Sequence, residues 1–309
     1  MRQLSRRRLL AAFPAFAAAA ACRAEPQRTP PAPASPAAAR PAAASPPAAA
    51  DPQPVTPYPT PTPAPRPRSA ETRLLLTGTP HETPLTIRHS GLPGPAAFVL
   101  GGVHGNEPGA WLAADEVAAW EPAAGSLLVL PRANVTAMAA FVRTFDDIGD
   151  LNRLYPGDPA SPLAMERMAH AILEAAREFA VTLLLDLHES WAFYAELPGA
   201  GTGALGQTIT VGPGPLQPSF GQQLADLLNP RLSPREQMIV RDGTRFGRPA
   251  TPVPQGQPNR GRSSLSAGGH VPGLTPVLVE MGQLDQPLER RVELHRLAAR
   301  AALQLLGIL

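Results

Sequence analysis

Short apolar runs alternate with helical stretches through residues 71–309, and this alternation is the feature that most restricts the fold of the chain. The apolar runs predict strands at 73–77, 96–100, 126–130, 181–187 and 276–280. Between them, apolar residues at helical spacing predict helices at about 108–120, 163–180, 218–228 and 286–306. Nearly continuous apolar strands that alternate with helices are typical of a mostly parallel sheet wrapped by helices. The sequence therefore predicts one α/β domain over residues 71–309, long enough to bury a substantial core.

The segment before this domain has a composition that does not build a core. Residues 23–70 consist almost entirely of Pro, Ala, Ser and Thr with scattered arginines, which favours extended polyproline II segments. At ~3.1 Å per residue, such a spacer extends on the order of 100 Å. The formal net charge of +2 partly reflects arginines in the first 70 residues, and no basic stripe is interleaved with aromatic residues. We therefore expect no nucleic-acid partner.

Residues 1–22 have the pattern of an export signal. Arg6 and Arg7 form a twin arginine, and the apolar stretch 11–21 is too short for a stable membrane helix. Cys22, the one cysteine of the chain, follows a run of alanines, as the acylated cysteine of a bacterial lipoprotein follows small residues. The alternative is an ordinary signal peptide that is cleaved after a small residue, in which Cys22 has no role. We expect a lipoprotein anchored on the outer side of the cytoplasmic membrane, or a secreted or periplasmic protein if Cys22 is not acylated. A single cysteine excludes an internal disulfide.

Candidate metal ligands follow two of the predicted strands. His104 and Glu107 lie three residues apart after the strand 96–100, and His188 follows the strand 181–187. Because ligands of parallel sheets bind beyond the carboxyl ends of the strands, we expect these side chains to meet there. Two histidines and one glutamate are a common donor set of an open zinc site, so the set predicts one bound Zn²⁺. Taken singly, a His-x-x-Glu pair or a lone histidine after a strand is also an ordinary turn feature.

An acid closes the last predicted strand. Glu280 follows the apolar run Val277–Val279, where a carboxylate buried without a partner would be costly. Beside a metal ion this carboxylate would take a proton from the bound water and act as a general base. The alternative is a structural salt bridge to a nearby arginine.

The loop after the strand 126–130 carries polar residues suited to an anionic substrate. Arg153 offers a planar guanidinium and Asn152 an amide donor, which together would hold a carboxylate. Arg143 is a second candidate cation, which would polarise a scissile carbonyl or hold its oxyanion. As isolated loop residues, arginines of this kind are more often solvated surface charges.

Four segments, in their order along the chain, resemble the zinc carboxypeptidase superfamily and, within it, the succinylglutamate desuccinylase and aspartoacylase branch. They are His104-Gly105-Asn106-Glu107, Asp150-Leu151-Asn152-Arg153, Asp186-Leu187-His188 and Val279-Glu280-Met281-Gly282. The resemblance covers roughly residues 90–285 and implies a three-layer α/β/α sandwich around a mostly parallel mixed sheet. The resemblance implies that His104, Glu107 and His188 are the zinc ligands and that Glu280 is the general base and acid. It also implies that Arg143 polarises the carbonyl group and that Asn152 and Arg153 bind the substrate carboxylate. Asp150 would orient a ligand histidine.

Two departures from the family affect the expected substrate. Carboxypeptidases of the superfamily carry a substrate-contacting tyrosine before the catalytic glutamate, but residues 240–275 contain none. That stretch instead carries the arginines Arg241, Arg245, Arg248, Arg260 and Arg262. We also expect a single helix after Glu280, without the additional β-domain that narrows the site of aspartoacylases, and hence an open site that admits a peptide.

The combined prediction is an exported zinc-dependent hydrolase of amide bonds next to a carboxylate. Its substrate would be an N-acyl amino acid, as for a deacylase, or a small peptide, as for a carboxypeptidase. We expect contact with the membrane through a lipid anchor only. A hypothesis from another class is a non-catalytic lipoprotein module that binds peptides or metal, although binding alone gives no reason for an unpaired acid beside the metal.

Overall fold

The computed structural model describes residues 63–197, 203–216, 219–243 and 262–309. The chain divides into two units, Met1–Ser45 and Pro46–Leu309, and all described residues belong to the second. The predicted export signal with Cys22, the spacer up to residue 62, and Arg245, Arg248 and Arg260 lie outside the described residues. Among the described helices, none combines the length and the apolar character needed to cross a membrane.

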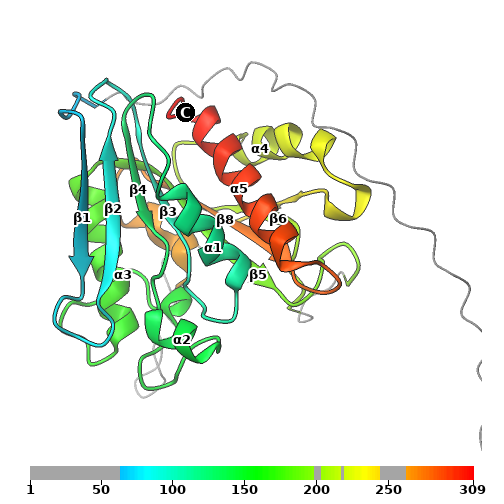
Figure 1. The fold of residues 1–309 in the computed structure, drawn as a ribbon, viewed down its shortest axis with the longest axis horizontal. Coiled ribbons are helices and arrows are strands. Elements are labelled where there is room, and N and C mark those ends of the chain that lie inside the picture. The colour runs from blue at the N-terminus through cyan, green and yellow to red at the C-terminus, as the bar shows by residue number, and fades with distance from the viewer. Residues whose placement is uncertain (1–62, 198–202, 217–218, 244–261) are drawn as a thin grey trace, which may run out of the picture. The chain divides into compact units, whose positions relative to one another are not determined.

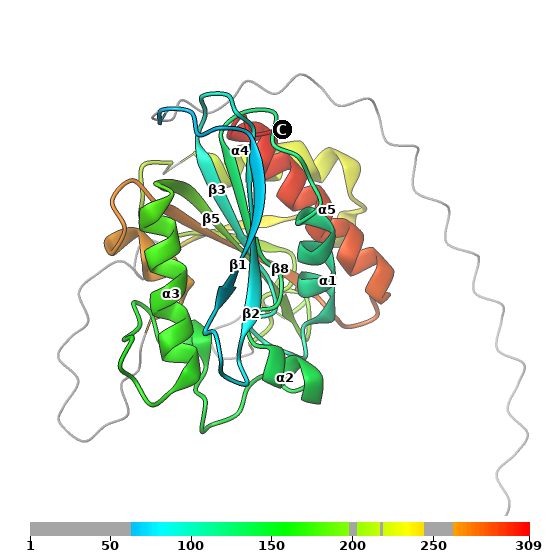
Figure 2. The same ribbon diagram turned by 60° about the vertical axis from the view of Figure 1, so that its left-hand side comes forward.

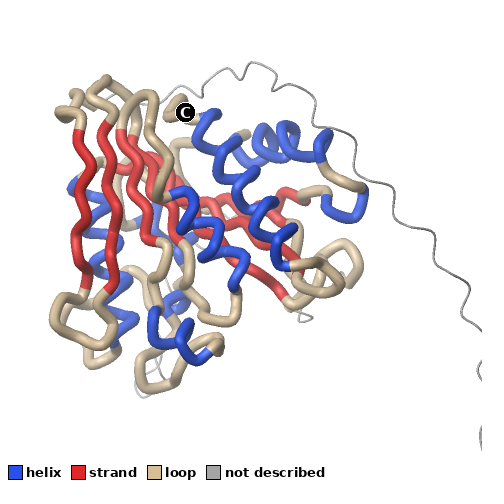
Figure 3. Tube along the Cα trace, in the orientation of Figure 1, coloured by secondary structure: helices blue, strands red, loops and turns tan. Residues whose placement is uncertain are grey.

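One mixed sheet forms the centre of the described residues (Figures 1 and 3). Its eight described strands are β1 (Ser69–Leu75), β2 (Thr83–His89), β3 (Ala96–Leu100), β4 (Ser126–Leu130), β5 (Val181–Ser190), β6 (Thr208–Val211), β7 (Ile239–Asp242) and β8 (Thr275–Gly282). They lie in the order β1-β2-β4-β3-β5-β8-β6-β7. The central strands β4, β3, β5 and β8 are parallel, β1 and β2 extend the sheet in antiparallel fashion, and β6 is antiparallel to β8. The predicted mostly parallel mixed sheet is confirmed.

Helices cover both faces of this sheet, which gives three layers (Figure 2). One face packs against α1 (Pro108–Val117), α4 (Phe220–Leu228) and α5 (Leu288–Leu305), and the other against α3 (Ala164–Glu178). Side chains of a strand alternate between faces, so in β3 Val99 packs on the α1 and α5 side whereas Phe98 packs on the α3 side. The short elements are α2 (Val135–Ala140) and the 3₁₀ helices η1 (Leu151–Arg153), η2 (Asn229–Arg231), η3 (Pro234–Glu236) and η5 (Ser264–Gly269).

The boundaries of the predicted strands differ where the pairing of neighbours extends them. β3 and β4 coincide with the predicted runs, but β5 and β8 remain paired up to Ser190 and Gly282. His188 and Glu280 therefore lie inside strands rather than after them. The strand predicted at 73–77 lies at 69–75, so the predicted domain boundary at residue 71 falls inside β1.

The apolar patterns do not predict β2, β6, β7 or α2. The inner face of β2 is built from Thr83, Leu85, Ile87 and His89, which alternate with more exposed residues, so that the strand has no apolar run. β6 and β7 have only four residues each, and α2 has six. Elements this short acquire their conformation from the neighbours with which they pair or pack.

Candidate active site

The three predicted metal ligands lie together where β3 ends and β5 runs alongside it. Nδ1 of His104 lies 2.6 Å from Oε1 of Glu107, and Nδ1 of His188 lies 2.9 Å from Oε2 of Glu107. One ligand atom from each residue lies within 4.8 Å of the others, and all three side chains are buried. The parallel pairing of β3 and β5 thus brings together residues from two distant segments, although His188 lies inside β5 and not beyond its end.

Glycines and a proline shape the turn that carries His104 and Glu107. Gly102 has a φ of +65°, a left-handed conformation that glycine adopts without a steric penalty. At Gly105, a Cβ would lie 2.1 Å from the backbone carbonyl carbon of Ala137, so glycine is needed for the turn to lie against α2. Pro108 begins α1 directly after Glu107, with its fixed φ suited to the first helical position. The position of the ligand pair is therefore fixed by local backbone geometry.

In each histidine, the second ring nitrogen, Nε2, also contacts a carboxylate. Nε2 of His104 lies 3.2 Å from Oδ1 of Asp150, the residue for which the resemblance implies an orienting role. Nε2 of His188 lies 3.0 Å from Asp186, which the sequence reasoning did not single out as a site residue. The signal was available, because Asp186 and His188 are two apart in one strand and so lie on the same face. Both contacts leave Nδ1 of the imidazole directed at Glu107, which is the role of carboxylate partners in metal sites.

The charges of the cluster stabilise one another against the cost of burial. Burial lowers the pKa of both histidines, but the nearby carboxylates outweigh it, and the pKa of His188 lies well above its ordinary value. Burial likewise raises the pKa of Glu107, but the two imidazoles outweigh it and lower the pKa below its usual range. Two imidazole nitrogens and a carboxylate oxygen at this spacing, with further carboxylates around them, fit a divalent cation such as zinc.

Glu280 lies in β8 directly opposite His188 in the parallel register with β5. Its side chain is buried, and burial is the main cause that raises its pKa to about 7. Among the residues that the structure describes, no arginine or other group forms an ion pair or hydrogen bond with it. The alternative of a structural salt bridge is therefore not found in the described part of the chain. With a pKa of about 7, the Glu280 carboxyl group beside the cluster can gain or lose a proton near neutral pH.

Arg143 joins the cluster from the loop after α2. Its Nε and Nη2 donate to Oδ2 of Asp150 at 3.2 and 3.1 Å, and Nη1 lies 3.8 Å from Oε1 of Glu107. About half of the side chain is exposed, so the guanidinium borders both the buried cluster and the solvent. Arg143 therefore contacts two carboxylates of the buried group, and its role toward a substrate carbonyl stays a prediction.

Asn152 and Arg153 lie in η1, two and three residues after Asp150. Asn152 is buried, and its Oδ1 accepts a hydrogen bond of 3.0 Å from the backbone N–H of Ser264 in η5. Arg153 is exposed and donates to the carbonyl of Asn152 at 2.7 Å. Asn152 therefore has a structural partner that its predicted role did not include, and Arg153 remains accessible from outside.

A second buried group of polar residues supports the same turn from the opposite face of β5. The carboxylate of Glu189 accepts from Nη1 of Arg291 at 2.7 and 2.6 Å, from the backbone N–H of Gly109 at 3.1 Å and from Gln283 at 3.2 Å. Gln283 also donates to the carbonyl of Asn106, next to Glu107. These contacts join α5 to the start of α1 and hold the metal-binding turn in place.

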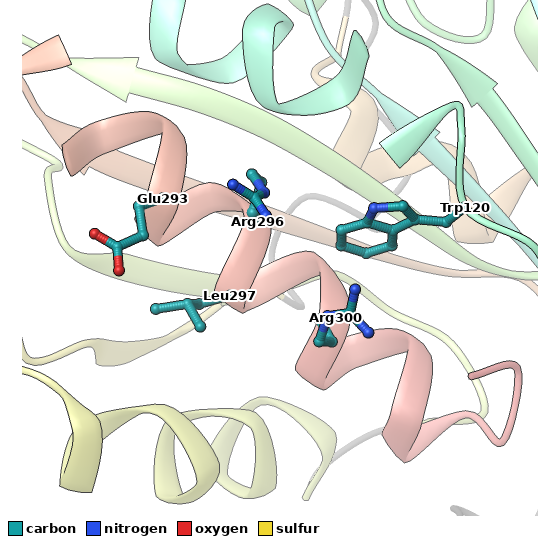
Figure 4. A pocket seen from close by; sticks show the side chains of 5 residues that line it. All are labelled: Trp120, Glu293, Arg296, Leu297 and Arg300. Atoms are coloured by element: carbon teal, nitrogen blue, oxygen red, sulfur yellow. The ribbon is translucent and has the colours of Figure 1, made fainter. Parts of the chain in front are cut away.

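A surface hollow of about 400 Å³ lies apart from these residues, between α5 and the chain after α1 (Figure 4). It is lined by Trp120, Glu293, Arg296, Leu297 and Arg300. Arg300 lies 4.5 Å over the Trp120 ring, and Arg296 pairs with Glu116 at 2.9 Å. Both arginines are thus engaged within the protein, and the hollow contains none of the predicted site residues.

Comparison with known proteins agrees with this geometry. Residues 93–194 match the succinylglutamate desuccinylase/aspartoacylase catalytic domain, a range that holds both histidines and Glu107 but not Glu280. Product-bound cell shape determinant protein Csd4 from Helicobacter pylori has a TM-score of 0.56 and 19% identity over 70% of this chain and 52% of its own. Its mDAP-bound form, described as a D,L-carboxypeptidase, has a TM-score of 0.54 and 19% identity over the same shares.

A succinylglutamate desuccinylase/aspartoacylase from Rhodobacter sphaeroides has a TM-score of 0.51 and 17% identity over 78% of this chain and 66% of its own. No curated protein matches the sequence. The chain spans about half the length of the Helicobacter protein. The matched range contains three of the four sequence segments on which the resemblance rests, and the solved structures share the α/β fold.

Proposed function

We propose that the protein is a zinc-dependent hydrolase of amide bonds next to a carboxylate, a proposal supported by the match of residues 93–194 to the succinylglutamate desuccinylase/aspartoacylase catalytic domain. The observation that carries the proposal is the pairing of a buried His-Glu-His cluster with an unpaired acid, Glu280, in the adjacent strand. A cluster with a purely structural purpose gives no reason for the second feature.

His104, Glu107 and His188 would hold the metal ion in this enzyme. A zinc ion bound there lowers the pKa of water and polarises a carbonyl group. The Glu280 carboxylate, with its pKa raised to about 7, accepts the proton that the attacking water loses. It then returns the proton to the nitrogen of the leaving amine. Arg143 donates hydrogen bonds to the carbonyl oxygen as that oxygen gains negative charge.

The substrate is proposed to carry a carboxylate close to the scissile amide. Arg153 is the accessible guanidinium of η1, and the amide nitrogen of Asn152 supplies a donor beside it. N-acyl amino acids and the C-termini of small peptides both have this arrangement. The Helicobacter protein with the same fold has been described with a tripeptide and with mDAP bound, which supports the peptide class.

Metal dependence and the role of Glu280 are tested together. Chelation should abolish hydrolysis of acyl amino acids or small peptides, and added zinc should restore it. Glu280→Gln should bind zinc as the wild type does, yet lose roughly 10²- to 10⁴-fold in kcat because the proton acceptor is gone. A Glu280→Gln enzyme with full activity would refute this role. Metal-loaded protein that binds peptides without turning any over would instead favour the non-catalytic binding module.

We further propose that the twin-arginine signal exports the folded domain and that Cys22 carries a lipid anchor. Each buried methylene of an acyl chain contributes ~0.8 kcal/mol, so more than one chain is needed for stable attachment. Cys22→Ser should release the protein from membranes or strand its precursor, and Arg6→Lys with Arg7→Lys should block export. Wild-type protein that leaves membranes in salt or carbonate washes would show that Cys22 is not acylated.

A further inference from the structure

The carboxylate of Asp186 is deeply buried but has few hydrogen-bond partners among the described residues. Its Oδ2 accepts from Nε2 of His188 at 3.0 Å and from Oγ of Ser264 at 2.5 Å. Its Oδ1 has no hydrogen-bond partner among the described residues. A buried carboxylate is costly when its acceptor capacity is not used. The Ser264 hydroxyl is therefore the one described donor, apart from the imidazole itself, that fixes the orientation of Asp186.

Ser264 is itself placed by the segment that orients the other histidine. Its backbone N–H donates to Oδ1 of Asn152 at 3.0 Å. Two residues earlier, Arg262 exchanges backbone hydrogen bonds with Tyr155, at 3.1 and 3.4 Å. Residues 150–155 thus contact His104 directly through Asp150 and reach His188 through Ser264 and Asp186.

We propose that Ser264 is a positioning residue of the metal site, which holds Asp186 so that Nδ1 of His188 faces Glu107 and the metal position. The hydroxyl of Ser264 donates to Asp186, so its effect on His188 passes through that carboxylate. Without it, the buried carboxylate keeps His188 as its one described donor and is free to rotate about its terminal bond. The proposal rests on the proposed function for its metal, but the geometry that it describes exists without one.

Ser266 supplies a matched control within the same 3₁₀ helix. It is as buried as Ser264, but its hydroxyl donates to the carbonyl of Ser263, three residues earlier in the chain, at 2.9 Å. Ser264→Ala and Ser266→Ala therefore remove the same atom from neighbouring buried positions. A general loss of packing in η5 would affect both variants, whereas loss of the contact with Asp186 would affect only the first.

The first measurement uses the full chain freed of metal and labelled with ¹⁵N at histidine. The Nε2 proton of His188, assigned by its absence in His188→Gln, should exchange with water at least about tenfold faster in Ser264→Ala and at the wild-type rate in Ser266→Ala. If Ser264→Ala does not fold, Ser264→Cys takes its place, because the thiol has similar volume but is a weak donor. An exchange rate of His188 equal to that of the wild type in the folded variant would overturn the proposal.

The second measurement is metal affinity, determined by competition with a chromophoric chelator. Partners of ligand histidines typically contribute 10- to 100-fold in affinity, and we expect about tenfold weaker zinc binding by Ser264→Ala. The visible spectrum of the cobalt-loaded variant should also shift, while Ser266→Ala matches the wild type in both respects. Equal affinity and spectra in the two variants would overturn the proposal. A wild-type protein that binds no zinc would refute the proposed function, while the exchange measurement would still report on Ser264.

Discussion

Removal of Arg291 should destabilise the protein strongly, because it leaves the Glu189 carboxylate buried without its charged partner. The side chain of Glu189 is fully buried and that of Arg291 nearly so. Breaking such a pair typically costs about 3–5 kcal/mol in free energy of unfolding. The N–H of Gly109 and the amide of Gln283 still donate to the carboxylate, so we expect Arg291→Met to lose about 3 kcal/mol, the lower end of that range. For a domain of this size, that loss corresponds to a Tm lower by roughly 6–12 °C.

A double-mutant cycle separates the ion pair from the loss of packing. Unfolding by urea should be measured in protein freed of metal, because bound metal would add its own stabilisation. Glu189→Gln with Arg291→Met should recover at least about half of the loss, because no buried charge then remains unpaired. Arg296→Met is the control, since Arg296 lies in the same helix but forms an exposed pair worth less than about 1 kcal/mol. A loss below about 1 kcal/mol in Arg291→Met, or strictly additive effects in the cycle, would refute this account.

Three further predictions concern other contacts. Asp150→Asn should weaken zinc binding by about 10- to 100-fold in a chelator competition, and unchanged affinity would contradict its orienting role. Arg153→Ala should lower kcat/KM for substrates with a free carboxylate, by a factor that corresponds to roughly 2–4 kcal/mol of transition-state stabilisation. It should hardly change kcat/KM for the amidated analogues, and equal losses on both kinds of substrate would exclude a carboxylate contact. Glu236→Gln should cost about 1 kcal/mol at pH 7, because its bond with Arg290 lowers the pKa of Glu236. That difference in stability should begin to shrink as the pH falls below the ordinary value of 4.5 and vanish only below the lowered pKa of Glu236. Glu293→Gln, at an exposed partner of the same arginine, should cost less than Glu236→Gln at pH 7.

Residues of the site were predictable from sequence where their signal is local. His104 and Glu107 share one turn, and His188 follows an apolar run, so the parallel arrangement of strands was enough to bring them together. The same strand contains the signal for Asp186, because a spacing of two residues in a strand means a common face. The extension of β5 and β8 past the apolar runs was not predictable, since it follows from the pairing of each strand with the other.

Contacts between segments that are distant in the sequence produce no local pattern from which they can be predicted. Ser264 lies 78 residues from Asp186 and 112 from Asn152, and a serine in a glycine-rich stretch has no pattern that indicates burial. The ion pair of Glu189 with Arg291 spans 102 residues. The periodicity of each segment shows which face is buried, but it does not identify the opposing side chain, because that depends on how helices and loops pack over the sheet.

The register of β5 and β8 has a consequence for how proteins of this architecture diversify. His188 and Glu280 are neighbours across a backbone ladder, so their separation is set by strand pairing and not by any loop. One residue inserted into β8 ahead of Glu280 would turn its carboxylate toward α1 and α5, away from the metal position. Insertions in the loops around the site leave that ladder unchanged. Changes of sequence around the site are therefore compatible with this arrangement when they fall in loops, whereas a one-residue shift of β8 ahead of Glu280 separates the carboxylate from His188.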